Sequence, residues 1–269
     1  MASNPIQIAR ILQALREHGF RETMGRANRH LMPGFLRVHS REEPSLRTIL
    51  RAGDVYTSGL DLAERVLRPI CQVNSIEELR VEYEGLSCEL SKRYPSRTLT
   101  YPEAFGVQSG SAFLLYAAIR LLQPEKVVET GVANGHSSYF LLRAMDRNQK
   151  GVLHSIEVKQ DVGVLLDPGE RSRWKLHIIA RRRMQNEFLQ AMSVIGPVDI
   201  FIHDSDHQYG WQSFELNAVL PYLSPSSLIL SDDVDVSYAF LDFCSRQRLR
   251  PIFLLQPQRV FGLVFNSAG

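Results

Sequence analysis

The chain has 269 residues, of which 44% are hydrophobic and 22% charged, and these proportions are typical of a globular protein. Its formal net charge of +2 lacks the strong basic excess of a dedicated nucleic-acid-binding protein. The three cysteines, Cys71, Cys88 and Cys244, form no CxxC pair, which excludes a zinc ribbon or a redox motif and favours a reducing compartment.

The first hundred residues predict helices. Apolar residues recur at helical spacing in residues 5–20, 45–70 and 76–90, and the second stretch is interrupted around residues 53–58. Residues 21–44 carry glycines and prolines and predict irregular structure. We expect residues 1–100 to form a helical lid or an oligomerisation arm, which would make a homo-oligomer. Helices that only pack against the main domain are an equal alternative.

Residues 101–269 predict one α/β domain in which short apolar strands alternate with helices. The predicted strands are 126–129, 152–157, 175–180, 198–203, 227–230, 251–255 and 259–265, and the predicted helices are 111–122, 137–145, 184–194, 211–222 and 237–246. The alternation indicates a doubly wound, mostly parallel seven-stranded sheet with helices on both faces. Only three residues join the last two strands, which must therefore run antiparallel.

No stretch has the pattern of a signal peptide or of a membrane span. Arg10, Arg16 and Glu17 interrupt the apolar residues of the N-terminus. The most apolar stretch, residues 112–119, ends at Arg120 and is too short to cross a bilayer. We therefore expect a cytoplasmic protein that acts on a small molecule rather than on a membrane or a nucleic acid.

A glycine-bearing turn follows the first strand of the α/β domain. Glu129 ends the strand, Gly131 and Gly135 follow in an ExGxxxG pattern, and a helix begins near Ser137. Glycine lets the backbone turn tightly and approach a ligand. The spacing differs from the GxGxxG of dinucleotide sites. An acid at the strand end favours a cationic group, such as an α-ammonium, over a phosphate.

Glu157 ends the next strand. An acid at that position accepts hydrogen bonds from ribose hydroxyls. The turn and this acid together predict a ligand that has an amino group and a ribose but no phosphate. S-adenosylmethionine meets this description.

The ExGxxxG turn, the acid at the second strand end and the terminal antiparallel hairpin resemble class I S-adenosylmethionine-dependent methyltransferases. The resemblance covers roughly residues 101–269 and implies the Rossmann-like methyltransferase fold. A glycine turn in another kind of α/β protein is the alternative. The resemblance implies cofactor contacts from six residues: Glu129, Gly131, Gly135, Ser137, Glu157 and Asp204.

Acidic residues also follow two later strands. Asp204 follows the strand at 198–203, and Asp232 and Asp233 follow the strand at 227–230. Because both strands end at the same edge of the sheet, these carboxylates should lie close together. Clustered carboxylates repel one another unless a cation or protons offset their charge. An all-oxygen set suits Mg²⁺, Mn²⁺ or Ca²⁺ rather than zinc.

This pairing resembles the metal-dependent O-methyltransferases of the catechol and caffeoyl-coenzyme A type, and more closely the macrolide-sugar enzymes of the macrocin and mycinamicin kind. The resemblance implies that Asp204, Asp232 and Asp233 bind a divalent metal, with Mg²⁺ favoured, and that His207 is the general base. The catechol enzymes often have an amide and a lysine where this chain has Asp233 and His207. The DSDH string also resembles cephalosporin-hydroxylase-like proteins of the same fold, which leaves the reaction open.

The implied reaction is methylation of a hydroxyl on a sugar or another natural product. A metal that chelates two substrate oxygens lowers the pKa of the hydroxyl, and a histidine accepts its proton near neutral pH. The alternatives are a cephalosporin-hydroxylase-like enzyme and a non-catalytic binding or assembly module. The charge and the lack of an Asn/Asp-Pro-Pro-Tyr-like string disfavour a nucleic-acid methyltransferase.

Each of these residues also has a purely structural interpretation. Asp232 and Asp233 are candidates to cap the following helix, and Asp206 is expected to cap the helix after it. His207 is a candidate surface residue at a helix start. His203 precedes Asp204 on the strand, so its side chain should point to the opposite face and pack there.

Overall fold

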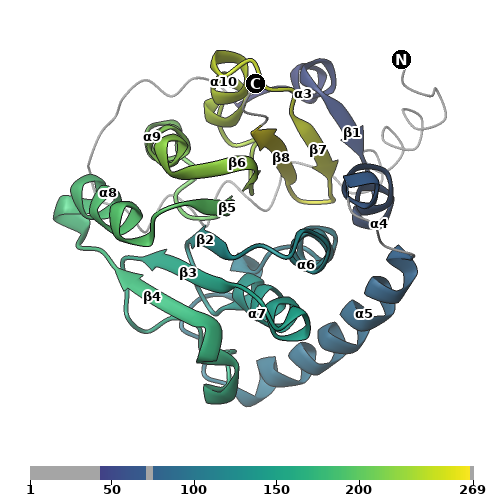
Figure 1. Ribbon diagram of the computed structural model, residues 1–269, viewed down its shortest axis with the longest axis vertical. Helices are drawn as coiled ribbons and strands as arrows, with labels where there is room; N and C mark the ends of the chain where they lie inside the picture. The colour runs from purple at the N-terminus through teal and green to yellow at the C-terminus, as the bar shows by residue number, and fades with distance from the viewer. Residues whose placement is uncertain (1–42, 71–74, 267–269) are drawn as a thin grey trace.

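A computed structural model describes residues 43–70 and 75–266 of the chain (Figure 1). The helix predicted at residues 5–20, Cys71 and most of the segment 21–44 lie outside the described residues. None of the helices in the described part of the chain is long and apolar enough to cross a membrane.

Eight strands in the described residues form one sheet, in the order β1-β7-β8-β6-β5-β2-β3-β4. The strands are β1 (Asp54–Tyr56), β2 (Lys126–Thr130), β3 (Val152–Glu157), β4 (Trp174–Ile178), β5 (Val198–His203), β6 (Leu223–Ser231), β7 (Ile252–Leu255) and β8 (Val260–Asn266). Strand β8 runs antiparallel to β6 and β7, and the other neighbours are parallel. The predicted doubly wound fold is confirmed. The order reverses between β5 and β2, where such sheets bind ligands.

Strand β1 adds an eighth strand to the seven expected from the sequence. It lies where the predicted helical stretch 45–70 is interrupted, and it pairs in parallel with β7, Asp54 opposite Ile252. A Cβ on Gly53 would lie 1.9 Å from the carbonyl oxygen of Pro251, so the chain passes close to the sheet edge there. Three residues are too few to show strand periodicity, and the sequence pattern therefore missed β1.

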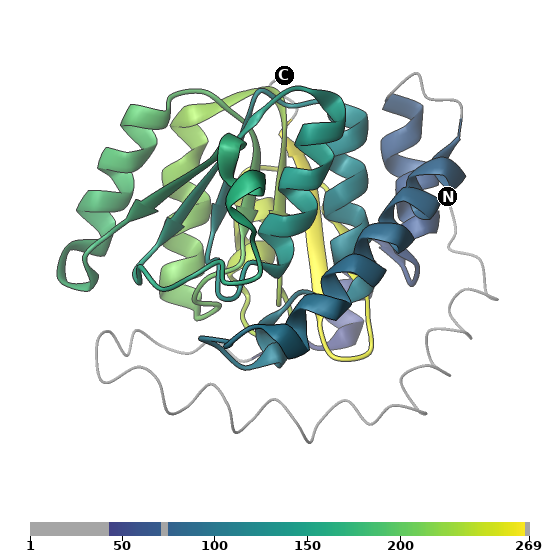
Figure 2. The same cartoon turned by 90° about the horizontal axis from the view of Figure 1, so that it is seen from below.

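Two layers of helices cover the sheet (Figure 1). Helices α4 (Gly59–Leu62), α5 (Ile76–Arg93), α6 (Ser109–Leu122) and α7 (His136–Asn148) contribute to the apolar core on one face. Helices α3 (Leu46–Ala52), α8 (Met184–Ile195), α9 (Tyr209–Val219) and α10 (Ala239–Arg246) contribute to the core on the other. Figure 2 shows α5 crossing the outside of its layer.

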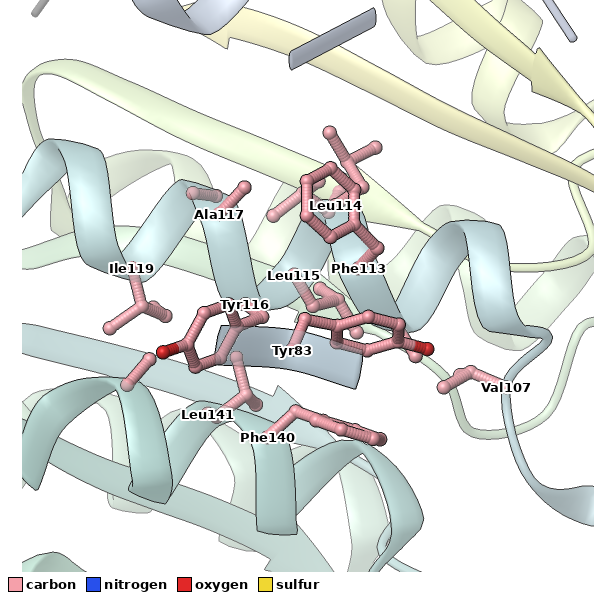
Figure 3. Close-up of a cluster of buried hydrophobic side chains, with 14 of the residues drawn as sticks. Tyr83, Val107, Phe113, Leu114, Leu115, Tyr116, Ala117, Ile119, Phe140 and Leu141 are labelled. Atoms are coloured by element: carbon pink, nitrogen blue, oxygen red, sulfur yellow. The ribbon is translucent and has the colours of Figure 1, made fainter. Parts of the chain in front are cut away.

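Helix α5 is fixed to α6 and α7 by one row of buried side chains at helical spacing. Tyr83, at the centre of this row, packs edge-on against Phe113 at a centroid distance of 5.4 Å and in a tilted arrangement against Phe140 at 4.9 Å (Figure 3). Its hydroxyl donates to the carbonyl of Ser109 at 3.0 Å. The helical region that precedes the α/β domain therefore shares its core.

Arg93, in the last turn of α5, ties this helix to the segment after β3. Its guanidinium donates to Glu170 Oε2 at 2.6 Å and to the carbonyl of Leu165 at 2.9 Å. It also lies 4.8 Å from the ring centre of Tyr139. The side chains of Arg93 and Glu170 are only 11% and 8% exposed, so water does little to screen this pair.

We expect Arg93→Met to lower the free energy of unfolding by about 3 kcal/mol, because the buried Glu170 loses its shortest cationic contact and keeps only Arg143, at 3.5 Å. Arg80→Met is the matched control, since Arg80 pairs with Glu77 and Glu84 on the exposed side of the same helix. That variant should change stability little. Urea denaturation of both variants tests the comparison, and equal losses would contradict a buried role for Arg93.

Candidate active site

Acidic side chains end four neighbouring strands at one edge of the sheet. Glu157 ends β3, Glu129 lies at the end of β2, Asp204 follows β5, and Asp232 and Asp233 follow β6. The sheet order places these strands side by side as β3-β2-β5-β6. The acids that the sequence singled out therefore share one carboxyl edge, and the reversal of strand order lies among them.

The glycines of the turn after β2 are required by neighbouring backbone. Gly131 has a φ of +81°, and a Cβ there would lie 2.0 Å from the carbonyl oxygen of Asp204. Gly135 has a φ of +91°, and its Cβ would lie 2.9 Å from the Cα of Gly163. Both positions need left-handed backbone and close approach, which favours glycine. The turn is thus pressed against the loops that follow β5 and β3.

The Glu129 carboxylate is buried and held by three serine hydroxyls. Ser138 and Ser155 donate to Oε1 at 2.5 and 2.6 Å, and Ser137 donates to Oε2 at 3.3 Å. Burial raises the pKa of Glu129 to about 7, although the three hydroxyls act in the opposite direction. The Oε2 atom, with one long hydrogen bond, keeps a lone pair for a further donor.

Glu157 lies beside this turn and is bound by two backbone amides. Val132 N donates to its Oε2 at 3.1 Å and Val158 N to its Oε1 at 2.7 Å. Each oxygen keeps a second lone pair. Nearby, Lys159 Nζ lies 4.6 Å from the ring centre of Tyr101. Burial and the charge of Glu157 raise the pKa of Tyr101 to about 12, which keeps the phenol protonated.

Asn134 fastens the segment before α6 to the glycine turn. Its Oδ1 accepts the backbone N–H groups of Thr100 and Tyr101, each at 3.1 Å, and its Nδ2 donates to the carbonyl of Tyr101 at 2.8 Å. All polar atoms of this side chain thus bind one short stretch of backbone. Tyr101 is thereby held beside Glu157.

Asp232 and Asp233 lie buried at the end of β6, with Arg259 between them and the start of β8. Arg259 Nη1 donates to Asp232 Oδ2 at 2.7 Å, and its Nε lies 3.4 Å from Asp233 Oδ1. Asp233 has a φ of +49°, a left-handed conformation that is strained for a residue with a side chain. Strain of this kind is concentrated at functional sites.

His207 lies beside the same cluster, near the end of the loop between β5 and α9. Its Nε2 lies 3.8 Å from Asp204 Oδ1 and 3.6 Å from Asp233 Oδ2, both longer than a hydrogen bond. Burial, and next the charge of His203, lower the pKa of His207 well below its ordinary value. Burial, and next the charge of Asp232, raise the pKa of Asp204 and Asp233. The lowered pKa favours the neutral imidazole, which keeps a lone pair.

The predicted metal ligands, Asp204, Asp232 and Asp233, do not fit a divalent ion in this arrangement. Within residues 43–70 and 75–266, no three acidic, histidine or cysteine side chains are arranged to hold a metal ion. The guanidinium of Arg259 contacts both acids of β6. The sequence-based prediction did not include Arg259, which brings a positive charge to the cluster from the residue before β8.

The structural interpretations of the neighbouring residues are resolved. His203 is fully buried, with Nδ1 2.5 Å from Glu215 Oε2, which confirms a packed histidine. Asp206 Oδ1 accepts the N–H of Gln208 at 3.0 Å, but Gln208 is itself the N-cap residue of α9 and the helix has no side-chain cap, so the expected capping by Asp206 is wrong. Helix α10 begins at Ala239, whose N–H binds Ser237, so Asp232 and Asp233 lie too early to cap it.

Residues 128–234 match the family described as a methyltransferase domain. These residues form a methyltransferase domain. The sequence-based prediction of a class I S-adenosylmethionine-dependent methyltransferase is thereby confirmed. No curated protein matches the sequence.

Solved structures share this fold. The O-methyltransferase TomG from Streptomyces achromogenes, involved in tomaymycin synthesis and solved with S-adenosylmethionine, has a TM-score of 0.51 at 15% identity. The similarity covers 78% of this chain and 96% of that one. A methyltransferase from Geobacter sulfurreducens has a TM-score of 0.51 at 17% identity, over 74% of this chain and 100% of that one. At these identities the likeness shows the fold.

Sequence reasoning missed two residues that contact the candidate site. Arg259 was expected only to begin a strand, and Asn134 only to lie within the glycine turn. No local pattern marks either residue, since their contacts lie 27 and 33–34 positions away in the chain. The sequence shows only that an arginine lies at the terminal hairpin and an asparagine inside the ExGxxxG turn. Neither position identifies the residue that its side chain contacts.

The raised pKa of Glu129 predicts a pH-dependent stability of the methyltransferase. In the unfolded chain the carboxyl ionises near its ordinary value of 4.5, but in the folded chain it holds its proton to about pH 7. Stability should therefore fall as pH rises between these values. Relative to Glu129→Gln, the wild type should lose about 3 kcal/mol of unfolding free energy from about pH 5 to pH 8. Parallel pH profiles of the two proteins in urea denaturation would contradict this effect.

Proposed function

We propose that this methyltransferase transfers the methyl group of S-adenosylmethionine to a hydroxyl oxygen of a small molecule, such as a sugar or another natural product. The observation that carries the proposal is the position of His207. Its Nε2 lies 3.8 Å from a carboxylate oxygen of Asp204 and 3.6 Å from one of Asp233. This group lies at the carboxyl edge, beside the turn that begins at Gly131.

The donors and acceptors around the glycine turn suit the cofactor. S-adenosylmethionine, when bound, supplies an electrophilic methyl group on a sulfonium. Glu129 Oε2, shared only with Ser137, has an acceptor position for the α-ammonium. Each carboxylate oxygen of Glu157 has an acceptor position for a ribose hydroxyl. Gly131 and Gly135 keep the turn free of side chains, and Asp204 adjoins Gly131 from the next loop.

His207 is suited to remove the proton of the substrate hydroxyl. The distances from Nε2 to Asp204 Oδ1 and Asp233 Oδ2 exceed a hydrogen bond, so no hydrogen bond among these three groups has to break before a hydroxyl binds Nε2. The neutral imidazole would take the hydroxyl proton at a ring nitrogen. Methyl transfer would form the oxygen–carbon bond and break the carbon–sulfur bond, with S-adenosylhomocysteine as the leaving group. The carboxylates orient the hydroxyl and stabilise the imidazolium that forms. Holding oxygen and methyl in line supplies much of the rate.

Charge and burial favour a small substrate over a nucleic acid. Asp232 and Asp233 are almost fully buried, and Arg259, the cation that contacts them, is only 6% exposed. A phosphate that reached this cluster would meet carboxylates. The exposed cations of the same edge, Arg181, Arg182 and Arg183, follow β4, which lies three strands away from β5. A neutral polyhydroxylated molecule meets acceptors that match its hydroxyl groups.

The proposal is tested by incubating the full chain with methyl-labelled S-adenosylmethionine and a panel of hydroxylated sugars, glycosides and catechols. Label in an ether product, identified by mass spectrometry, is the expected result. Transfer to nitrogen or carbon in the accepted substrates would contradict hydroxyl chemistry. An oxidised, unmethylated product would instead favour the cephalosporin-hydroxylase-like alternative.

A further inference from the structure

Arg259 lies inside the carboxylate cluster and is fixed there on three sides. Its Nη1 donates to Asp232 Oδ2 at 2.7 Å, and its Nε lies 3.4 Å from Asp233 Oδ1. The third nitrogen, Nη2, donates to the carbonyl of Ala104 at 3.1 Å. The residue is only 6% exposed, so this guanidinium is a permanent charge of the interior rather than a surface group.

The turn that carries the two acids is also tied to the strand that carries Arg259. Val234 N donates to the carbonyl of Val260 at 3.0 Å, and Val260 N donates to Asp235 Oδ1 at 3.0 Å. These bonds hold the ends of β6 and β8 together on either side of the guanidinium. The strained φ of Asp233 belongs to the same turn. The backbone therefore places arginine and carboxylates in a set arrangement.

The carboxylate oxygens around Arg259 already have neighbours that a metal would displace. Asp232 Oδ2 and Asp233 Oδ1 face the guanidinium. Asp233 Oδ2 and Asp204 Oδ1 lie 3.6 and 3.8 Å from His207 Nε2. A second cation here would be repelled by Arg259, because charges in a buried site are weakly screened.

We propose that Arg259 supplies, from within the chain, the positive charge that the resemblance to metal-dependent O-methyltransferases assigns to a divalent ion. The carboxylates of the cluster then act as acceptors for substrate and as fixed neighbours of His207. The inference has two parts: the cluster binds no divalent metal, and turnover needs none. The second part rests on the proposed function. The first part concerns metal binding alone and does not depend on the proposed function.

The inference also limits the class of substrate. A metal-assisted site selects molecules with two neighbouring oxygens, because both bind the ion. With Arg259 in place of the ion, a single hydroxyl meets the needs of the site. Asp232 Oδ1 is buried without a hydrogen-bond partner and offers an acceptor to a polar group that enters the cluster. Isolated hydroxyls should therefore be methylated as readily as vicinal diols.

Mn²⁺ binding to the full chain, measured by electron paramagnetic resonance, tests the first part without any substrate. The wild type should show no stoichiometric Mn²⁺ site. Arg259→Met frees Asp232 and Asp233 and should gain one site per chain, with an affinity at least about tenfold above the wild type. The double variant Arg259→Met with Asp232→Asn should lose it again. Arg259→Lys, which keeps a charge, is the matched control and should not bind.

Two results would overturn the inference. One is stoichiometric Mn²⁺ binding by the wild type that Asp232→Asn abolishes, since the cluster would then be a metal site despite Arg259. The other is an Arg259→Met variant that folds and gains no Mn²⁺ site. If that variant fails to fold, Arg259→Gln replaces it, because its amide can still donate to Asp232. In the turnover assay, wild-type rates should be unchanged in EDTA. If no substrate is accepted, the proposed function fails, and Mn²⁺ binding still decides whether the cluster is a metal site.

Discussion

Gly131→Ala is expected to lower the free energy of unfolding by more than about 4 kcal/mol, enough to remove most of the stability of an ordinary domain. An alanine at a φ of +81° costs about 1–2 kcal/mol by itself. Its Cβ would also lie 2.0 Å from the carbonyl oxygen of Asp204, so the turn and the next loop must separate. Urea denaturation followed by circular dichroism measures the loss.

Gly85→Ala is the control that isolates this effect. Gly85 lies inside helix α5, and a Cβ there meets nothing within 4 Å. The same chemical change should therefore stabilise the protein, by about 0.5–1 kcal/mol, because alanine favours the helix. If Gly131→Ala proved as stable as the wild type, the close contact between the two loops would be wrong, and with it the position of Asp204.

Replacing His207 with alanine is expected to lower kcat by about 10²- to 10⁴-fold, the range for loss of a general base. Binding of S-adenosylmethionine should persist, because the acceptors assigned to the cofactor lie on Glu129 and Glu157. Steady-state kinetics on an accepted substrate, together with cofactor titration, separate the two effects.

His177→Ala is the matched control for His207→Ala. His177 lies on the edge strand β4 and contacts His154 at 3.0 Å, away from the acid cluster. Its replacement should leave kcat within about twofold, as expected for a residue outside the chemistry. Unchanged kcat in His207→Ala would remove this residue as the base. A loss of cofactor binding in the same variant would show that His207 supports the site rather than the proton transfer.

The sequence predicted the elements of the site better than their contacts. Strand and helix periodicity located the carboxyl edge, because β2, β3, β5 and β6 are buried strands with acids at their ends. The sequence also located the glycine turn, but the reason for glycine at these positions differs from the one expected. Gly131 and Gly135 were expected to admit a ligand, whereas each already meets backbone from another loop. A local pattern records the need for glycine and not the group that approaches it.

Arg259 shows why the charge balance of the cluster could not be predicted. Its contact with Asp232 depends on the antiparallel register of β6 and β8, in which Ser231 pairs with Gly262. Register is set by the packing of whole strands, and a shift of one residue would turn Arg259 to the other face. From the sequence alone, three carboxylates therefore implied a metal, although the fold delivers a cation of its own.

The central claim is that the carboxyl edge around Gly131 binds S-adenosylmethionine, and calorimetric titration of the purified full chain tests it most directly. We expect one-to-one binding that persists in EDTA and weakens at least about tenfold in Glu157→Gln, which removes a charged acceptor. Absence of binding by the wild type, or full affinity in Glu157→Gln, would contradict this assignment of the cofactor site.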